Sequence, residues 1–112
     1  MALLAFWEFG RLVVDLHLLC KQGQRNKRVG PEPTRYETGT WPVTDEVAEE
    51  AVGGRLYLHA ARAEEAYYGG TIQAWRRSPE DPKRKVFTYL VDGPFRIRCP
   101  EKWGQEKAIV RR

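Results

Sequence analysis

GGRLYLH at residues 53–59 and YYGGTIQAW at residues 67–75 decide the fold of this chain. Each stretch joins a Gly-Gly pair to a run of apolar and aromatic residues, which is typical of a β-strand entered from a turn or a bulge. The first pair can be a helix stop and the second a bulge. Neither pair has the spacing of a phosphate-binding loop, so the two stretches predict strands in the middle of a small β-barrel.

The strand pattern continues towards the C-terminus. The sequence SPEDP at residues 78–82 favours a turn within an antiparallel pair, and Asp92-Gly93 is a strong signal for a tight turn. Ile109-Val110 could add a strand that closes the sheet against an earlier one. The four strands predicted around these turns cover residues 55–60, 71–77, 85–91 and 95–99.

A short helix precedes the first of these strands. Thr44 is a good N-cap, and Asp45 and Glu46 lie in the first turn, where the helix dipole favours negative charge. Gly53 supplies a C-terminal stop. The pattern predicts a helix over residues 45–52 with one apolar face.

The chain has 112 residues, the usual size of one domain with one core. Residues 2–20 are apolar on most sides and fit either a helix or, over residues 11–19, a strand, which we favour. Residues 21–40 are basic and broken by Gly and Pro, which predicts an exposed loop, and residues 41–112 would form the barrel core. The expected fold is α+β: a small, mostly antiparallel β-barrel with one or two short helices.

Cysteine usage and the N-terminal sequence indicate the compartment. Cys20 and Cys99 are far apart and lack metal-ligand spacing, so we expect free thiols, no metal and no other cofactor. Glu8, Arg11 and Asp15 interrupt the apolar N-terminal run before it reaches membrane-spanning length. We therefore expect a cytoplasmic protein without a membrane partner.

The positive charge is concentrated in the C-terminal half. Residues 67–112 carry eleven Lys or Arg against five Asp or Glu, whereas residues 44–66 carry two against six. Cations interleaved with aromatic residues are what a phosphate backbone and exposed bases select, although strands also carry Lys and Arg simply on a solvent face. The candidates for phosphate binding are Arg76, Arg77, Lys83, Arg84 and Lys85.

Aromatic residues are the second sign of a ligand. Four Trp, five Tyr and four Phe are many for so short a chain, and Trp is enriched where a ligand is held. Trp41, Tyr57 and Trp75 are the candidates for base stacking. Trp41 and Trp103 lie beside Pro and Gly, which indicates loops, and at least one of them is expected to plug a barrel end.

His59 is the natural candidate for a general base. Alternation along its strand puts Leu56 and Leu58 towards the core and His59 on the opposite, polar face. Glu64 or Glu65 in the following loop could fold back to act as its partner. A single His on a polar strand face is more often a surface or hydrogen-bonding residue, so catalysis is the less favoured interpretation.

The order of a capped helix, a Gly-Gly strand with His59, a second Gly-rich strand and basic antiparallel strands resembles the PUA-like superfamily, specifically its EVE and ASCH branches. The resemblance covers roughly residues 40–100, with residues 55–59 at an early barrel strand and residues 69–72 at the next. It implies a barrel that holds nucleic acid, or a modified or flipped base, in a cleft beside the helix. The long apolar N-terminal element is not the usual opening of such domains.

The sequence therefore favours a module that binds nucleic acid, RNA or DNA, and is not an enzyme. One alternative is a small RNase or amidohydrolase of the ASCH type that uses His59 with Glu64 or Glu65. Another is a protein-interaction module or inhibitor that presents the acidic stretch at residues 45–65, with Glu49 and Glu50 in contact with a protein partner. The oligomeric state is left open.

Overall fold

The computed structural model describes residues 14–20, 26–31, 34–92, 96–100, 102–104 and 106–111. This part of the chain is a small α+β domain with a mostly antiparallel sheet and one short helix, as expected. The elements are β1 Val14–Leu19, β2 Asn26–Arg28, β3 Arg35–Trp41, α2 Asp45–Ala51, β4 Arg55–His59, β5 Tyr68–Arg77, β6 Lys85–Val91 and β7 Lys107–Arg111.

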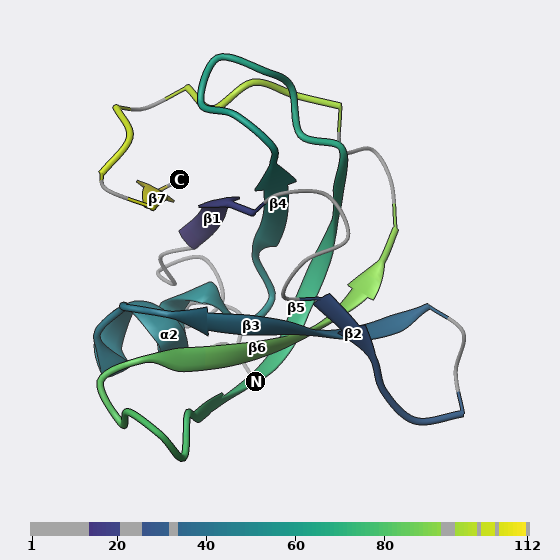
Figure 1. The fold of residues 1–112 in the computed structure, drawn as a ribbon, viewed down its shortest axis with the longest axis vertical. Helices are drawn as coiled ribbons and strands as arrows, with labels where there is room; N and C mark the ends of the chain where they lie inside the picture. Colours follow the sequence, from purple (N-terminus) through teal and green to yellow (C-terminus); the bar gives the residue numbers. More distant parts are fainter. Residues whose placement is uncertain are drawn as a thin grey trace, which may run out of the picture.

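The seven strands found in the described residues form one sheet in the order β2-β3-β6-β5-β4-β1-β7. Strand β1 runs parallel to β4, and the other neighbouring strands are antiparallel. The sheet is strongly twisted, so that β3 and β6 run across the view while β4 and the upper part of β5 rise steeply (Figure 1).

The expected barrel is wrong, because the sheet is not closed. Ile109 and Val110 do lie in a strand, and β7 does pair with the earlier strand β1. The described residues of β7 and β2 nevertheless stand at opposite ends of the strand order and do not pair with each other. Closure needs a continuous ladder around the barrel, and the three-residue β2 ends the ladder on its side.

The helix α2 forms as predicted, one residue shorter than expected. The Thr44 side chain accepts a hydrogen bond from the backbone N–H of Val47 at 3.2 Å, which caps the first turn. Gly53, at φ 89°, lies just beyond the helix in the left-handed region that glycine favours. The buried helix residues Val47, Ala48 and Ala51 pack into the same core as the strands.

Strands β1 and β4 are buried on both faces. Leu16 pairs in register with Leu56 on the face that packs into the hydrophobic core. His17 pairs with Tyr57 on the opposite face, yet these side chains are only 1% and 7% exposed. The expectation that the second face of β4 is a polar surface is therefore wrong, because residues that follow β4 and β6 cover it.

The second glycine of each Gly-Gly pair is required by a close backbone approach. A Cβ on Gly54 would lie 2.0 Å from the carbonyl oxygen of Val14, and one on Gly70 would lie 1.7 Å from that of Leu90. The register shift in β5 falls between Ile72 and Ala74 and not at the glycine pair, so the bulge expected there is displaced. The glycines thus allow β5 and the start of β4 to approach their neighbours.

Other predictions of elements have mixed outcomes. Strand β1 confirms the strand expected in residues 11–19 as far as it is described, and residues 2–13 lie outside the described residues. The predicted loop over residues 21–40 is wrong, because β2 and β3 lie within it and β3 pairs along β6. The hairpin of β5 and β6 around residues 78–84 is confirmed.

The strand expected at residues 95–99 is wrong for its described part. Residues 96–100 have no regular structure, because the backbone there bonds to a loop: the carbonyl of Ile97 accepts from the N–H of Ala66 at 2.9 Å. Gly93 and Phe95 lie outside the described residues, and so does the tight turn predicted at Gly93. Cys20 and Cys99 form no disulfide with each other.

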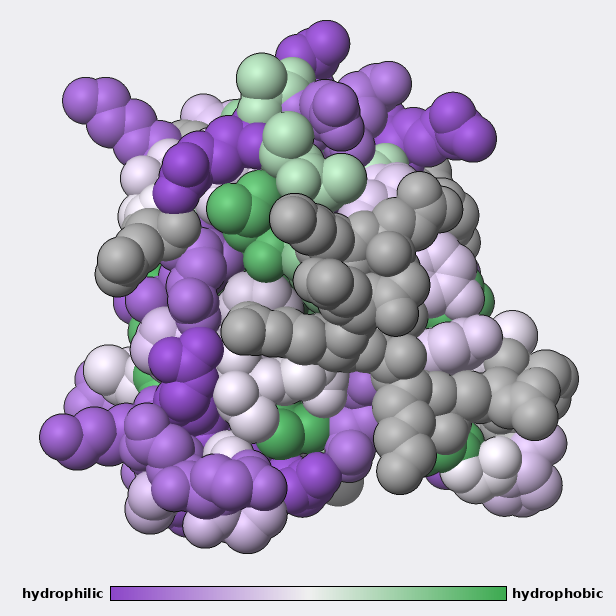
Figure 2. All heavy atoms as spheres, in the orientation of Figure 1, coloured by the Kyte–Doolittle hydropathy of each residue, from purple (hydrophilic) through white to green (hydrophobic). Residues whose placement is uncertain are grey.

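Among the described residues, no helix is both long and apolar enough to cross a membrane. On the face shown in Figure 2, hydrophilic residues dominate the margins, and hydrophobic residues drawn in colour form only small patches. Ile97, 37% exposed, is the large hydrophobic residue that the described surface presents. Polar and charged side chains are therefore the main contact groups on this face.

We predict that Gly70→Ala lowers the free energy of unfolding by about 3 kcal/mol, because the new methyl group would displace a backbone carbonyl inside the sheet. Gly30→Ala is the matched control: Gly30 has φ 72° but open space around its missing side chain, so only backbone strain of about 1 kcal/mol is expected. Urea denaturation measures both. Equal losses would contradict the close approach.

Candidate nucleic-acid interface

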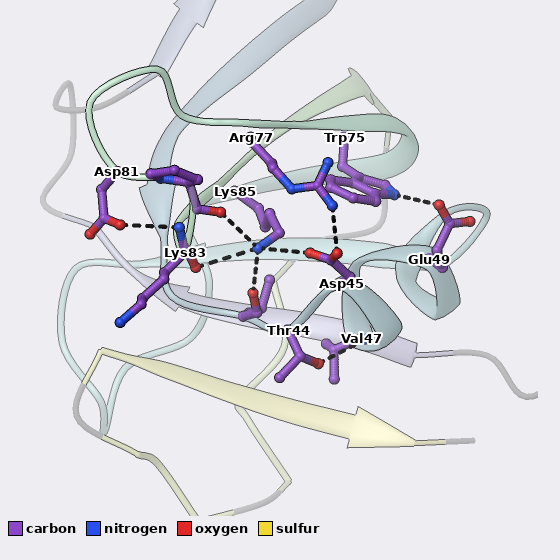
Figure 3. A network of polar contacts seen from close by, with 11 residues as sticks. Thr44, Asp45, Val47, Glu49, Trp75, Arg77, Asp81, Lys83 and Lys85 are labelled. Carbon is purple, nitrogen blue, oxygen red and sulfur yellow. Dashed lines mark hydrogen bonds and ion pairs between the residues drawn. The ribbon is translucent and has the colours of Figure 1, made fainter.

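One candidate site lies where the β5–β6 hairpin meets the start of α2. Arg77 and Lys85 are register partners next to the turn of the hairpin, and Trp75 lies two residues before Arg77 on β5. The Arg77 guanidinium carbon lies 5.3 Å from the centre of the Trp75 ring, and Lys85 Nζ lies 5.9 Å from it. The indole N–H donates to Glu49 of α2 at 3.1 Å (Figure 3).

Asp45 holds the two cations together. Its carboxylate oxygens lie 3.1 Å from Lys85 Nζ and 2.5 Å from Arg77 Nη2. Hydrogen bonds from Lys85, and then from Arg77, lower the pKa of Asp45. The first turn of the helix is thus tied to the hairpin by a carboxylate that stays charged.

Lys85 is a structural residue. Its side chain is 3% exposed, and its ammonium donates to the carbonyls of Val43 at 3.1 Å, Pro82 at 3.3 Å and Lys83 at 3.4 Å. A buried ammonium is tolerated only when its donors are satisfied. With Asp45 as a further partner, Lys85 has no donor to spare for the phosphate that the sequence assigned to it.

A pocket of about 550 Å³ opens beside this network. Its volume falls in the range of small-ligand sites. Apolar walls from two prolines and a valine face the polar groups at the helix start. The lining residues are Pro42, Val43, Thr44, Asp45, Arg77, Pro82, Lys83 and Lys85.

The remaining predicted phosphate ligands differ in availability. Arg76 pairs with Glu37 at 2.9 Å, and the hydrogen bonds that it donates to Glu37 raise the pKa of Arg76. Arg84 is less exposed and pairs with Glu106 at 2.6 Å. Lys83 is exposed on the turn. Exposed pairs are weak, so Arg76, Arg77 and Lys83 are the cations that a ligand could recruit at little cost.

The predicted stacking residues do not come together. Trp41 is the last residue of β3, not part of a loop, and its side chain is fully buried in the core. Tyr57 lies on the other face of the sheet, where its ring stacks on His17 at 4.7 Å. Only Trp75, which is half-buried, can meet a ligand in the observed conformation.

His59 belongs to a separate, buried cluster. Its Nε2 lies 2.7 Å from Nδ1 of His17, and its Nδ1 lies 2.9 Å from the backbone carbonyl of Glu64. A carbonyl can only accept, so His59 Nδ1 carries the proton and His59 Nε2 accepts from the Nδ1–H of His17. A neutral pair therefore has fixed tautomers, with the proton of each ring on Nδ1.

The predicted acid–base group of His59, Glu64 and Glu65 is not assembled. Glu64 and Glu65 are exposed, and His59 contacts the backbone of Glu64 and not its carboxylate. They line a pocket of about 440 Å³ with Tyr67, Arg96 and Arg98, while His59 is 0% exposed beneath the loop.

Sequence reasoning missed His17 and Trp103 as parts of the His59 cluster. The Trp103 ring centre lies 5.1 Å from that of His59 and 6.3 Å from that of His17, nearly perpendicular to both. Its indole N–H donates to the carbonyl of Arg62 at 3.1 Å. The available signal was the alternation in residues 14–19, which puts His17 on the face opposite Leu16.

Burial depresses both imidazole pKa values. Desolvation, followed by the nearby His59, lowers the pKa of His17 to about 4, although Asp15 acts in the opposite direction. Desolvation also lowers the pKa of His59, against the hydrogen bond to Glu64. The folded state thus holds the pair neutral at pH values where a free imidazole is charged.

Two carboxylates of the acidic stretch, residues 45–65, already have partners within the domain. Glu49 accepts from Trp75, and Glu50 pairs with Arg111 of β7 at 2.9 Å. Among the described residues, no group of three or more His, Cys, Asp or Glu is arranged to hold a metal ion. In comparisons with protein-family models, curated proteins and solved structures, no match to this chain was found.

We predict that stability falls as the pH drops from 6.5 towards 4. The lowered pKa of His17 means that the unfolded chain binds more protons in this window, so unfolding becomes easier as acid is added. The loss expected from His17 is roughly 2–3 kcal/mol. Urea denaturation across the window measures it, and the slope should flatten in His17→Asn. An unchanged slope in that variant would refute the assignment.

Proposed function

We propose that this domain binds single-stranded nucleic acid at the hairpin surface, defined as Trp75, Arg76, Arg77 and Lys83 with the adjoining pocket. A base would lie against Trp75 or enter the pocket. Arg77 and Lys83 would contact phosphates on that side, and Arg76, which points to the opposite side of β5, would contact a phosphate where the strand passes the edge of the hairpin. The observation that carries the proposal is the half-exposed Trp75 indole, which is flanked by cations beside a pocket large enough for a nucleobase.

The chemistry of the pocket supports a flat, partly polar ligand. Pro42, Val43 and Pro82 offer apolar contact to a ring, while Thr44 and Asp45 add polar groups to the lining. Stacking on an aromatic side chain is tolerant of base identity, so the hairpin surface suits a single strand better than a duplex with paired, stacked bases.

Charge pairing limits how strongly phosphates can contribute. Arg76 and Arg77 are 52% and 54% exposed in their ion pairs, so phosphate can compete for them. Lys85 and Arg84 are committed to partners inside the fold. We therefore infer about three phosphate contacts and modest, salt-sensitive affinity.

A distant PUA-like relationship is part of this proposal. The strongly twisted sheet and the short helix beside it agree with such a domain, and the pocket lies beside that helix. The open sheet is a departure from it. The enzymatic alternative draws no support from His59, because a fully buried imidazole cannot reach a substrate in this conformation.

We predict that Trp75→Ala weakens binding of a single-stranded oligonucleotide about 5-fold to 100-fold, because stacking contributes roughly 1–3 kcal/mol per base. Trp75→Phe should keep most of the affinity. Fluorescence anisotropy with labelled single- and double-stranded RNA and DNA measures both. Thermal melting must show that the variants remain folded.

The matched control is Arg111→Ala. Arg111 lies on β7, its side chain is 50% exposed, which is similar to that of Arg77, and its ion-pair partner is Glu50 of α2. It should leave affinity nearly unchanged, whereas Arg77→Ala should weaken binding severalfold. Equal effects of the two variants would contradict the hairpin surface. Absence of binding to every oligonucleotide would instead favour a protein partner.

We also predict the salt dependence. Three phosphate contacts give a slope of about −2 in log affinity against log salt concentration, and Lys83→Ala should reduce its magnitude by about 0.7. Titrations at four salt concentrations measure the slopes. A slope that is unchanged in Lys83→Ala would place the phosphates elsewhere on the molecule.

A further inference from the structure

The second face of β1 and β4 is closed by a cover, defined as a first part, residues 60–66, and a second part, residues 96–100 and 102–104. The two parts of the cover run side by side above the strands (Figure 1), and the N–H of Ala66 donates to the carbonyl of Ile97 at 2.9 Å. Arg98 donates to the carbonyl of Ala63, and Trp103 donates to that of Arg62. These bonds join the two parts of the cover to each other.

The His17–His59 pair joins this cover to the sheet. Nδ1–H of His59 donates to the carbonyl of Glu64 in the first part, and the rings of both histidines pack against Trp103 in the second. Both imidazoles are at most 1% exposed. Packing of the cover on the sheet therefore depends on a hydrogen-bonded pair that is neutral.

We propose that the His17–His59 pair is a pH-sensitive latch whose protonation opens the cover while the rest of the sheet stays folded. A first proton can be shared between the two rings, but a proton on each ring would set two N–H groups against each other across 2.7 Å, which breaks the bond between the rings. A proton on His17 would place a charge under the indole, without the water that normally solvates it.

The charged and ionisable groups around the two histidines determine how low the pH must be for the latch to open. From β1, Asp15 favours the charged form of His17. From β4, the Tyr57 ring stacks on His17, and the guanidinium carbon of Arg55 lies 5.6 Å from the centre of the Tyr57 ring. From the cover, Glu64 offers its carbonyl, and Arg98 bonds to the backbone. Strand β7 sets the neutral Ala108 opposite His17.

Burial outweighs the favourable charge of Asp15, so the latch stays closed near neutral pH and is expected to open below it. Opening would expose both imidazoles, against which Trp103 packs in the closed cover. Strands β5 and β6 form the long hairpin, so their protection provides an internal reference.

The test is hydrogen exchange of the whole chain from about pH 7.5 to about pH 3.5, corrected for intrinsic rates, with imidazole titration followed by NMR on the same sample. We expect protection in the cover to fall at least about tenfold, at the pH where the imidazoles titrate, while β5 and β6 keep theirs. Loss of protection in all regions together, or titration without loss in the cover, would overturn the proposal.

Two variants separate the latch from a general effect of acid. His17→Asn keeps a side-chain N–H for His59 Nε2, and its amide can turn to accept once His59 is protonated, so its cover should stay protected throughout. Tyr57→Phe keeps the stacked ring and should open as the unmodified protein does. Opening of His17→Asn at the same pH would contradict the latch. If that variant does not fold, the NMR comparison on the unmodified chain still decides.

Discussion

Burial of β1 and β4 on both faces is the constraint on which this domain depends. On one face, leucines pack against the helix, and on the other face the same strands carry polar side chains that have no access to water. Buried polar groups must find partners, so His17 and His59 bond to each other and to the backbone. Their neutrality and fixed tautomers follow from that requirement.

The basic end of the molecule is shaped in the same way, because several of its cations already have partners inside the fold. The sequence has an excess of cations, but Lys85 fastens the hairpin to α2, and Arg84 fastens it to Glu106 near β7. Net charge therefore overstates the cationic surface available to a polyanion. What remains at the hairpin is a small site, in which one aromatic ring and a pocket matter more than charge.

The sequence predicted the elements whose signals are local. Thr44 and Gly53 bound the helix, and alternation defined β4 and β6 well. Strand β3 was missed because Gly and Pro dominate the surrounding composition, whereas its formation depends on pairing with β6. Residues 96–99 alternate like a strand, but Ile97 bonds to a loop instead. Tertiary pairing decided both cases.

Prediction of the candidate sites from the sequence was limited in the same way, by contacts between residues far apart along the chain. Alternation gave the correct face for His59, but that face is an interior because Trp103, far along the chain, and the loop with Glu64 pack over it. Nitrogen-15 NMR of both imidazoles at neutral pH tests the account most directly, because shifts and couplings report which ring nitrogen is protonated. The account predicts that both rings are neutral, with the proton on Nδ1. A proton on Nε2 of His59, or a charged ring at neutral pH, would contradict it.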